Sequence, residues 1–313
     1  MREGSPAAGA GVGESPVAVA VVTRNRSLLF ERYALDSLRQ ARAEGAEVIV
    51  IDQSDGRTTA MLASRLGDIG YLHSPPGLSR GRNLAVRRTR APVIAFIDDD
   101  VRLPPGWVST MTELFAGDPD VGAVCGRGRD GRGRELPGRA AGNYGGSASP
   151  FGLGSGFNFA FRRAALSSAG DFDENLGAGA RFRSAEDTDM LYRVLRERWE
   201  VLCSERVTVI HYDWRSPRQE LLIHRDYGLG AGAFTRKHSW AGDRTAAAFA
   251  RREADGHLRT LGRAVLTLRP RVAVLQVMWL AGFRRGYRRR PDDRQPSAPA
   301  SPEAGRSARP REG

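Results

Sequence analysis

The amino-terminal half of the chain alternates apolar runs with amphipathic stretches, a pattern that predicts a parallel α/β sheet. Residues 17–22 and 47–51 are runs rich in β-branched residues, as expected for strands that are buried on both faces. Between them, apolar residues from Ser27, a candidate N-cap, to the helix breaker Gly45 approximate helical spacing. Strand, helix and strand within about 35 residues form a βαβ unit, so we expect a right-handed crossover.

The same pattern continues toward the middle of the chain. Residues 57–66 predict a second helix, residues 69–72 predict a short strand, and a helix that begins near Ser79 ends before Pro92. The apolar run 93–97 then predicts a further strand.

The second half of the chain is less regular. Residues 126–149 are rich in Gly and Arg and are expected to form a mobile connection, whereas residues 152–161 alternate like a strand or hairpin. Ser184 is a candidate N-cap for a helix with one apolar face, and further helical segments follow Glu220.

Three adjacent acids, Asp98, Asp99 and Asp100, follow the apolar run 93–97. Adjacent carboxylates repel one another, and proteins tolerate such a cluster when a cation neutralises it. Hard divalent ions such as Mg²⁺ or Mn²⁺ prefer oxygen ligands. Because side chains alternate along an extended chain, Asp98 and Asp100 can share one ion while Asp99 bonds elsewhere. The ion would bridge diphosphate oxygens and stabilise a departing nucleoside diphosphate. The alternative is a solvated strand-to-turn junction.

Polar residues also follow the first two predicted strands. Thr23 and Asn25 follow the first, and Asp52 and Ser54 follow the second. Ligands of open α/β sheets collect at the carboxyl ends of parallel strands, so we expect these side chains to converge with the aspartates.

The loop 77–83 brings glycines, arginines and an amide to the opening of a predicted helix. Backbone N–H groups and the guanidinium of Arg82 could hold phosphate there, beside Asn83. Loops of this composition are common. This loop is a candidate phosphate-binding loop because it lies just upstream of the acidic strand.

A second acidic group, Glu186 and Asp187, stands at the start of the helix after Ser184. Exposed N–H groups and the helix dipole favour acids there without any function. The stretch 170–175 adds further acids, and in this context Asp187 is a positioned carboxylate that can accept a proton from an alcohol. His211, after another predicted strand, is either a metal ligand, a group near the leaving phosphate or a structural histidine.

Six segments together resemble, in order, the signature of family 2 glycosyltransferases with the GT-A fold, over residues 17–215. They are Val22-Thr23-Arg24-Asn25 and residues 48–52, 77–83, 96–100, 170–174 and 186–189. Each segment is loose by itself, whereas six in order are specific. The resemblance implies an α/β fold in which helices flank a mostly parallel sheet, with a helical carboxyl-terminal extension.

The resemblance also implies an inverting transfer from a nucleoside-diphosphate sugar, UDP- or dTDP-linked, to a hydroxyl of a glycan, a lipid-linked carrier or a small molecule. Asp187 would be the base, and Glu186 would orient the acceptor or share the proton. Mn²⁺ or Mg²⁺ would be held by Asp100 and Asp98, with His211 as a further candidate ligand. The donor would be bound by Thr23, Asn25, Asp52, Ser54, Arg82, Asn83, Asp98 and Asp99.

The chain is expected to fall into five parts. These are a disordered tail over 1–16, a nucleotide-sugar-binding half over 17–125, an acceptor-side half over 126–215, a helical region over 216–290 and a disordered tail over 291–313. The Gln-x-x-Arg-Trp type motif and the membrane spans of processive family members are not found, so we expect one sugar to be added per encounter.

Composition adds an anionic partner to this picture. The net charge of +12 suggests a nucleotide, a phospholipid headgroup or a nucleic acid, although a coding preference for Arg would explain the same excess. The two cysteines, Cys125 and Cys203, predict no disulfide framework. Residues 1–16 lack the apolar core of a secretory signal, so we expect a cytoplasmic protein.

One carboxyl-terminal segment suggests contact with a membrane. Residues 272–283 are apolar, contain Trp279 and are bracketed by arginines, and the run is shorter than the ~18 residues that a span needs. The segment could lie on the anionic inner face of the plasma membrane, where it would suit a lipid-linked acceptor. A helix that closes over the sheet is the alternative.

Two rival functions are less consistent with the sequence. A nucleotidyltransferase usually has a Gly-rich loop directly after its first strand, and residues 23–26 contain no glycine. An Arg-rich nucleic-acid-binding protein would gather its basic residues, whereas here they are dispersed and the acids lie where a phosphate backbone would be repelled. We therefore expect no nucleic-acid partner.

Overall fold

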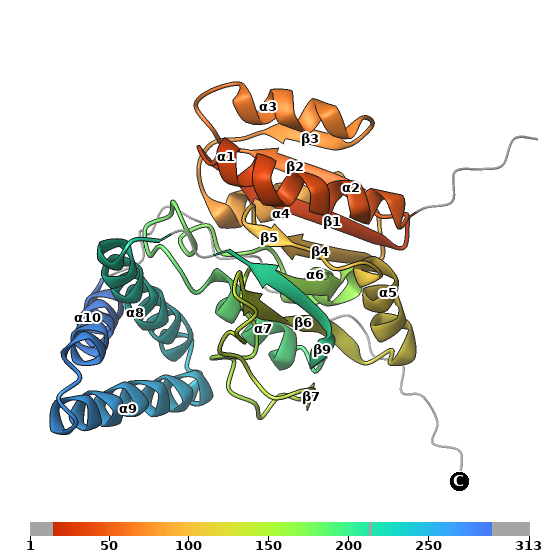
Figure 1. Ribbon diagram of the computed structural model, residues 1–313. Helices are drawn as coiled ribbons and strands as arrows, with labels where there is room; N and C mark the ends of the chain where they lie inside the picture. Colours follow the sequence, from red (N-terminus) through yellow and green to blue (C-terminus); the bar gives the residue numbers. More distant parts are fainter. Residues whose placement is uncertain (1–14, 213–214, 290–313) are drawn as a thin grey trace, which may run out of the picture.

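The computed structural model describes residues 15–212 and 215–289. The strands of this part of the chain form one sheet in the order β3-β2-β1-β4-β8-β6-β9-β5, with β7 paired to β9 (Figure 1). The strands are β1 (Val17–Thr23), β2 (Glu47–Asp52), β3 (Gly70–His73), β4 (Val93–Ile97), β5 (Val101–Arg102), β6 (Val121–Asp130), β7 (Gly142–Tyr144), β8 (Asn158–Arg162) and β9 (Glu200–His211). Apart from Ser15 and Pro16, the predicted tails lie outside the described residues.

Helices flank the sheet and continue beyond it. They are α1 (Ser27–Leu29), α2 (Leu35–Ala43), α3 (Thr58–Ala63), α4 (Leu78–Arg88), α5 (Trp107–Gly117), α6 (Arg163–Ala169), α7 (Glu186–Arg196), α8 (Pro217–Trp240), α9 (Arg244–Leu266) and α10 (Pro270–Arg288). A π-helical turn, η1 (Phe30–Ala34), joins α1 to α2, and a 3₁₀ turn, η2 (Ser64–Leu66), follows α3.

The amino-terminal strands pair in parallel. β1 lies between β2 and β4, and β2 also pairs with β3. β8 is antiparallel to its neighbours β4 and β6, and β6 is parallel to the long strand β9. The predicted α/β fold with a mostly parallel sheet is therefore confirmed, and the carboxyl ends of β1, β2 and β4 meet at one edge.

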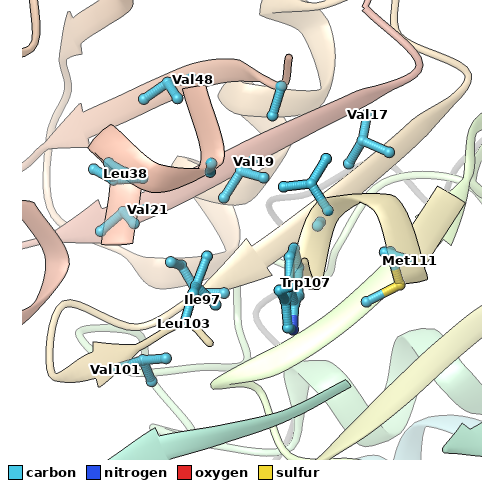
Figure 2. Close-up of a cluster of buried hydrophobic side chains, with 14 of the residues drawn as sticks. Val17, Val19, Val21, Leu38, Val48, Ile97, Val101, Leu103, Trp107 and Met111 are labelled. Carbon is cyan, nitrogen blue, oxygen red and sulfur yellow. The ribbon is translucent and has the colours of Figure 1, made fainter. Parts of the chain in front are cut away.

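Alternation along β1 places its side chains in two separate cores. The odd-numbered valines pack with Leu38 of α2 and Trp107 of α5 in the cluster that Figure 2 shows. The even-numbered residues, Ala18 and Ala20, belong to a second cluster with residues of α4, α6 and α7. A continuous apolar run is required because both faces of the strand are covered.

Two predicted helix starts are wrong. The first helix is capped by Arg26, whose side chain makes no cap hydrogen bond, so Ser27 lies inside the helix. Helix α7 begins after Ala185, which has a left-handed φ of 70°. The hydroxyl of Ser184 instead donates to the backbone oxygen of Asp226 in α8, 2.6 Å away. Tertiary contact with α8 therefore replaces the local cap.

The segment predicted to be a mobile connection is built into the sheet. β6 continues through Asp130, Arg129 forms a bridge with Glu135, and β7 pairs with β9. The predicted strand over 152–161 begins only at Asn158. Gly-rich composition misled the prediction, because glycines here admit neighbouring side chains: a Cβ at Gly126 would lie 2.1 Å from Asn158 Nδ2.

Helices α8, α9 and α10 stand beside the sheet as a separate group (Figure 1). Glycines hold α8 against α10, since a Cβ at Gly232 would lie 2.1 Å from the backbone oxygen of Phe283, and one at Gly286 would lie 2.0 Å from that of Leu229. Close packing against α10 is thus the role of glycines in α8 such as Gly232. Within the described residues, no helix is both long enough and apolar enough to cross a membrane.

Candidate functional site

Side chains from the carboxyl ends of β1 and β4 meet directly. The hydroxyl of Thr23 donates a 2.6 Å hydrogen bond to the carboxylate of Asp99, and both side chains are buried. Asp99 also pairs with Arg26, which contacts Asp100 as well, at 2.6 Å and 3.1 Å. The loop after β1 therefore supplies a hydrogen bond and a positive charge to the acidic triplet.

A candidate metal centre is formed by Asp98, Asp100 and His211. Their ligand atoms all lie within 4.8 Å of one another, and His211 Nε2 is 3.2 Å from Asp100 Oδ1. Strand pairing fixes the arrangement, because Val101 of β5 lies opposite His211 at the end of β9. Two carboxylates and one imidazole are a donor set that suits a divalent ion such as Mn²⁺.

The electrostatics of this centre favour a cation. Burial raises the pKa of Asp98, and the charge of Asp100 raises it further. Burial acts in the same direction on Asp100, but its hydrogen bond with His211 and the charges of His211 and Arg26 leave its pKa lowered. Burial opposes protonation of His211, yet the bond to Asp100 raises its pKa. A bound cation would neutralise both carboxylates and take over the imidazole nitrogen, so these residues fit a metal.

A hollow of about 590 Å³ opens beside the loop that follows β2. Its lining includes Ser54 and Asp55 from that loop and Tyr71 and His73 from β3. His73 Nε2 lies 3.0 Å from the backbone oxygen of Ser54, so the two sides of the hollow are joined. An aromatic ring beside backbone and hydroxyl groups is a surface that suits a flat heterocycle.

The predicted nucleoside residues take different places around this hollow. Asn25, with a left-handed φ of 53°, exchanges hydrogen bonds with Asp55 at the rim and donates its backbone N–H to Ser54. Asp52 is fully buried beneath it, where it accepts from the backbone of Ser54 and the hydroxyl of Tyr71, each at 2.9 Å. Burial and Asp52 raise the pKa of Tyr71 to about 12. Asp52 thus shapes the hollow and does not line it.

Asn83, which was predicted to bind the donor, has partners within the chain for both polar groups of its amide. Its amide donates to the backbone oxygen of Phe172 at 2.9 Å and accepts from the N–H of Phe172 at 2.7 Å, and the side chain is buried. Both polar groups of the amide are therefore used to fasten the acidic loop 170–175 to α4.

Arg82 has a different partner from the predicted phosphate. Its guanidinium is buried, pairs with Glu186 at 2.8 Å and donates to the backbone oxygen of Gly156 at 2.9 Å. It also lies 4.8 to 5.7 Å from the ring centres of three aromatic residues, Phe96, Phe159 and Phe172. This buried ion pair fixes the position of the first residue of α7 relative to α4.

Asp187 is the acid of this group that stays half-exposed. One carboxylate oxygen accepts from the N–H of Gly156 at 3.1 Å, and the other accepts from Thr188 at 2.7 Å. Glu186 next to it is buried, and burial, followed by the charge of Asp187, raises the pKa of Glu186 to about 7. Asp187 therefore has the exposure that a base needs, and Glu186 has not.

Asp189 completes the acidic group and joins it to the helical extension. It is fully buried and bonds to Arg193, Lys237 and His238 at 2.8 to 3.0 Å. Although burial disfavours its charge, these three groups, with Lys237 foremost, hold the pKa of Asp189 well below its usual range. Its role is to anchor α8.

Tyr227 of α8 lies near the start of α7, although it was not among the predicted site residues. Its side chain is 45% exposed. Its pKa is raised by burial and, against the opposing charge of Arg215, by the carboxylates of Asp187, Asp98 and Glu186. The neighbouring residue Asp226 accepts a hydrogen bond from Ser184, so Tyr227 lies close to the start of α7. Its only signal in the sequence is its place beside the glycines of α8. Arg26, Tyr71 and His73 were also absent from the predicted site residues.

Comparisons with known proteins agree with this arrangement. The profile described as glycosyl transferase family 2 matches residues 18–168. A search of curated proteins finds no match. Among solved structures, the mannosyltransferase PcManGT from Pyrobaculum calidifontis, in complex with GDP-Man and Mn²⁺, is 18% identical with a TM-score of 0.61, and the match covers 87% of each chain.

A second solved structure, residues 1–349 of S. aureus TarS, is 14% identical with a TM-score of 0.52. The match covers 86% of this chain and 91% of that one. At these identities the likeness shows the fold, which is the GT-A fold that the sequence motifs predicted.

Proposed function

Because the chain belongs to glycosyl transferase family 2 and is a glycosyltransferase, we propose that it moves a sugar from a nucleoside-diphosphate sugar to an acceptor hydroxyl by a metal-dependent, inverting displacement. One observation carries the proposal. The three candidate metal ligands converge at the carboxyl edge of the sheet, and the half-exposed carboxylate of Asp187 belongs to a separate acidic group.

The donor would lie across the carboxyl ends of the parallel strands. Its heterocycle would occupy the hollow beside Tyr71 and His73, and its diphosphate would reach Asp98, Asp100 and His211. A divalent ion bound there supplies Lewis acidity, which stabilises the negative charge of the departing diphosphate. The solved relative binds GDP-Man with Mn²⁺, so we consider GDP- as well as UDP- and dTDP-linked sugars.

Asp187 would act on the opposite side of the sugar. Its carboxylate accepts the proton of the acceptor hydroxyl while that oxygen attacks the anomeric carbon, and the bond from this carbon to the diphosphate breaks. One displacement inverts the anomeric configuration. The Gly156 N–H keeps the carboxylate oriented, and Glu186 acts through position, because its side chain is held by Arg82.

Binding of the donor is the first test. We expect UDP-, dTDP- or GDP-linked sugars to raise the melting temperature only when Mn²⁺ is present, since a ligand at 100 times its Kd stabilises by about 2.7 kcal/mol. Asp100→Asn should abolish the shift. Asp36→Asn, an exposed acid on α2, is the matched control and should keep it. A shift that is equal with EDTA, or unchanged in Asp100→Asn, would remove the metal assignment.

Tyr227 is proposed to contact the acceptor, because the hydrogen bond between Ser184 and the neighbouring Asp226 brings this part of α8 to the start of α7. Tyr227→Ala should raise the acceptor KM and leave the Mn²⁺-dependent donor shift intact. A loss of donor binding in this variant would mean that Tyr227 contacts the donor and not the acceptor.

A further inference from the structure

The turn between α9 and α10 presents apolar side chains to solvent. Val265, Leu266 and Leu268 are 60%, 86% and 87% exposed, and Leu258 and Val274 on the adjoining helices are also exposed. Isolated exposed leucines are ordinary, but a group in one turn marks an interaction surface. We call residues 265–269 the apolar tip.

The backbone of the apolar tip directs one leucine outward. Leu268 has a left-handed φ of 51°, and the turn closes with hydrogen bonds from Arg269 N–H to Ala264 and from Leu268 N–H to Val265. Glycine usually fills this position after a helix, because a side chain strains it. An exposed leucine in a strained backbone conformation does not stabilise the folded chain, which points to a role in binding.

The charge around the apolar tip is mainly positive. Residues 256–283 contain four arginines and no acidic residue. Arg271 pairs with Glu220, whereas Arg259, Arg263 and Arg269 form no ion pair with any residue that the structure describes. Leucines among unneutralised arginines match a bilayer that carries anionic headgroups above an apolar interior.

The apolar tip lies at the active-site end of the extension. α8 and α10 run side by side in the same direction, since Arg271 pairs with Glu220 near their starts and Arg236 bonds to the backbone oxygen of Tyr287 near their ends. Along α8, Glu220 is about 10 Å from Tyr227, at a rise of about 1.5 Å per residue. A surface that the tip touches would therefore be near the acceptor side of the site.

Trp279, the residue that the sequence suggested as a membrane anchor, is buried. Its ring stacks on His257 of α9 with 3.7 Å between ring centres. The segment 272–283 is thus largely the contact between α10 and its neighbouring helices, and the exposed apolar residues lie mainly at the turn before it.

We propose that the apolar tip docks the enzyme on the surface of an anionic phospholipid bilayer. Leu266 and Leu268 enter the headgroup region, and Arg259, Arg263 and Arg269 contact lipid phosphates. A second copy of the chain is a poorer occupant, because a symmetric contact would place these arginines against their own equivalents. Binding to lipid needs neither donor nor metal, so this proposal stands or falls separately from the proposed function.

Vesicle flotation of the full chain tests the proposal. Wild-type protein should partition onto phosphatidylcholine vesicles with 40% phosphatidylglycerol at least tenfold better than onto phosphatidylcholine alone. Leu266→Ser/Leu268→Ser should lose at least tenfold of this binding, and Arg263→Gln/Arg269→Gln should flatten its dependence on salt. Trp240→Gln, which changes an exposed aromatic residue at the other end of α8, is the control and should bind like wild type.

Three outcomes would overturn the proposal. They are equal binding to neutral and anionic vesicles, unchanged binding of the leucine variant, and equal loss in Trp240→Gln. Light scattering on the same samples tests whether a second copy of the chain, instead of a bilayer, binds the apolar tip. If wild type is a dimer that Leu266→Ser/Leu268→Ser converts to a monomer, and neither binds vesicles, the tip is an interface between copies. Circular dichroism confirms that each variant is folded.

Discussion

The two acidic groups at the carboxyl edge of the sheet differ in what neutralises them. The triplet 98–100 faces Arg26, whose side chain is 27% exposed, and His211 at the end of a strand. At the start of α7, Arg82, which is 2% exposed, holds Glu186, and Asp189 is held by three groups of which Lys237 is itself 36% exposed. Both groups are rich in acids, and the counter-charge that Arg26 supplies is more open to solvent, and so more exchangeable, than the one that Arg82 supplies.

Under the proposed function, this difference gives each group a separate task. An exchangeable counter-charge would allow a metal and a diphosphate to enter and leave with every turnover. Permanent counter-charges cancel Glu186 and Asp189, so that one carboxylate, Asp187, remains at the surface with a fixed direction. Under the proposed function, similar residues thus serve as an ion site or as a base according to the partners that surround them.

Asp187→Asn should produce the largest effect. The amide keeps the size of the side chain and loses the ability to accept a proton, so kcat should fall by about 10²- to 10⁴-fold. The Mn²⁺-dependent donor shift should remain, which calorimetry with the donor alone measures. Retention of full transfer would show that Asp187 is not the base. Loss of donor binding would mean that Asp187 also belongs to the donor site, so that the two acidic groups have no separate tasks.

Arg82→Met should be the most destabilising change. Removal of Arg82 leaves the buried carboxyl of Glu186 without its counter-charge, and breaking such a pair costs about 3–5 kcal/mol. Chemical denaturation measures the loss. The double variant Arg82→Met/Glu186→Gln should recover much of it, because no buried charge then remains; no recovery would mean that the packing of Arg82 among its phenylalanines matters more than its charge.

Arg26→Met should have a smaller effect that metal reverses. Asp99 and Asp100 lose a charged partner, and loss of such a hydrogen bond costs about 1–3 kcal/mol. Millimolar Mn²⁺ should restore the melting temperature, since the ion replaces the lost charge. The same addition should leave Arg82→Met unchanged. Rescue of both variants, or of neither, would contradict the contrast between exchangeable and permanent partners.

The pH dependence of stability should show the smallest effect. The pKa of Glu186 rises from 4.5 to about 7 on folding, so its contribution is complete below pH 4.5 and is lost as the pH rises through 7. Between pH 5 and 8, wild type should lose more unfolding free energy than Glu186→Gln, by a difference on the order of 1 kcal/mol. Urea titrations at the two pH values measure it; parallel curves would contradict the raised pKa.

Much of the donor side could be predicted from the sequence, because local pattern determines it. Apolar runs placed β1, β2 and β4, and parallel topology brought Thr23 and the aspartates to one edge. Side-chain alternation correctly separated Asp99, which bonds Thr23, from Asp98 and Asp100, which face His211.

The remaining features depend on contacts between distant segments. Asn83 matches a phosphate-loop pattern, yet its amide is used by Phe172, 89 residues later. Tyr227 reaches the site only because α8 docks on the start of α7. No local periodicity encodes such contacts, and the same holds for Ser184, whose hydroxyl serves α8 instead of its own helix.

Lys237, the only lysine in this sequence, bridges Asp173 and Asp189 at 2.8 Å and 3.0 Å. Amine-directed chemistry can therefore address one side chain, and that side chain lies where α8 meets the catalytic domain. A reagent such as an activated ester reacts with free amines and poorly with an ammonium held between two carboxylates. The rate of labelling at Lys237 thus reports, without any engineered probe, how often the helical extension lifts away from the body of the enzyme.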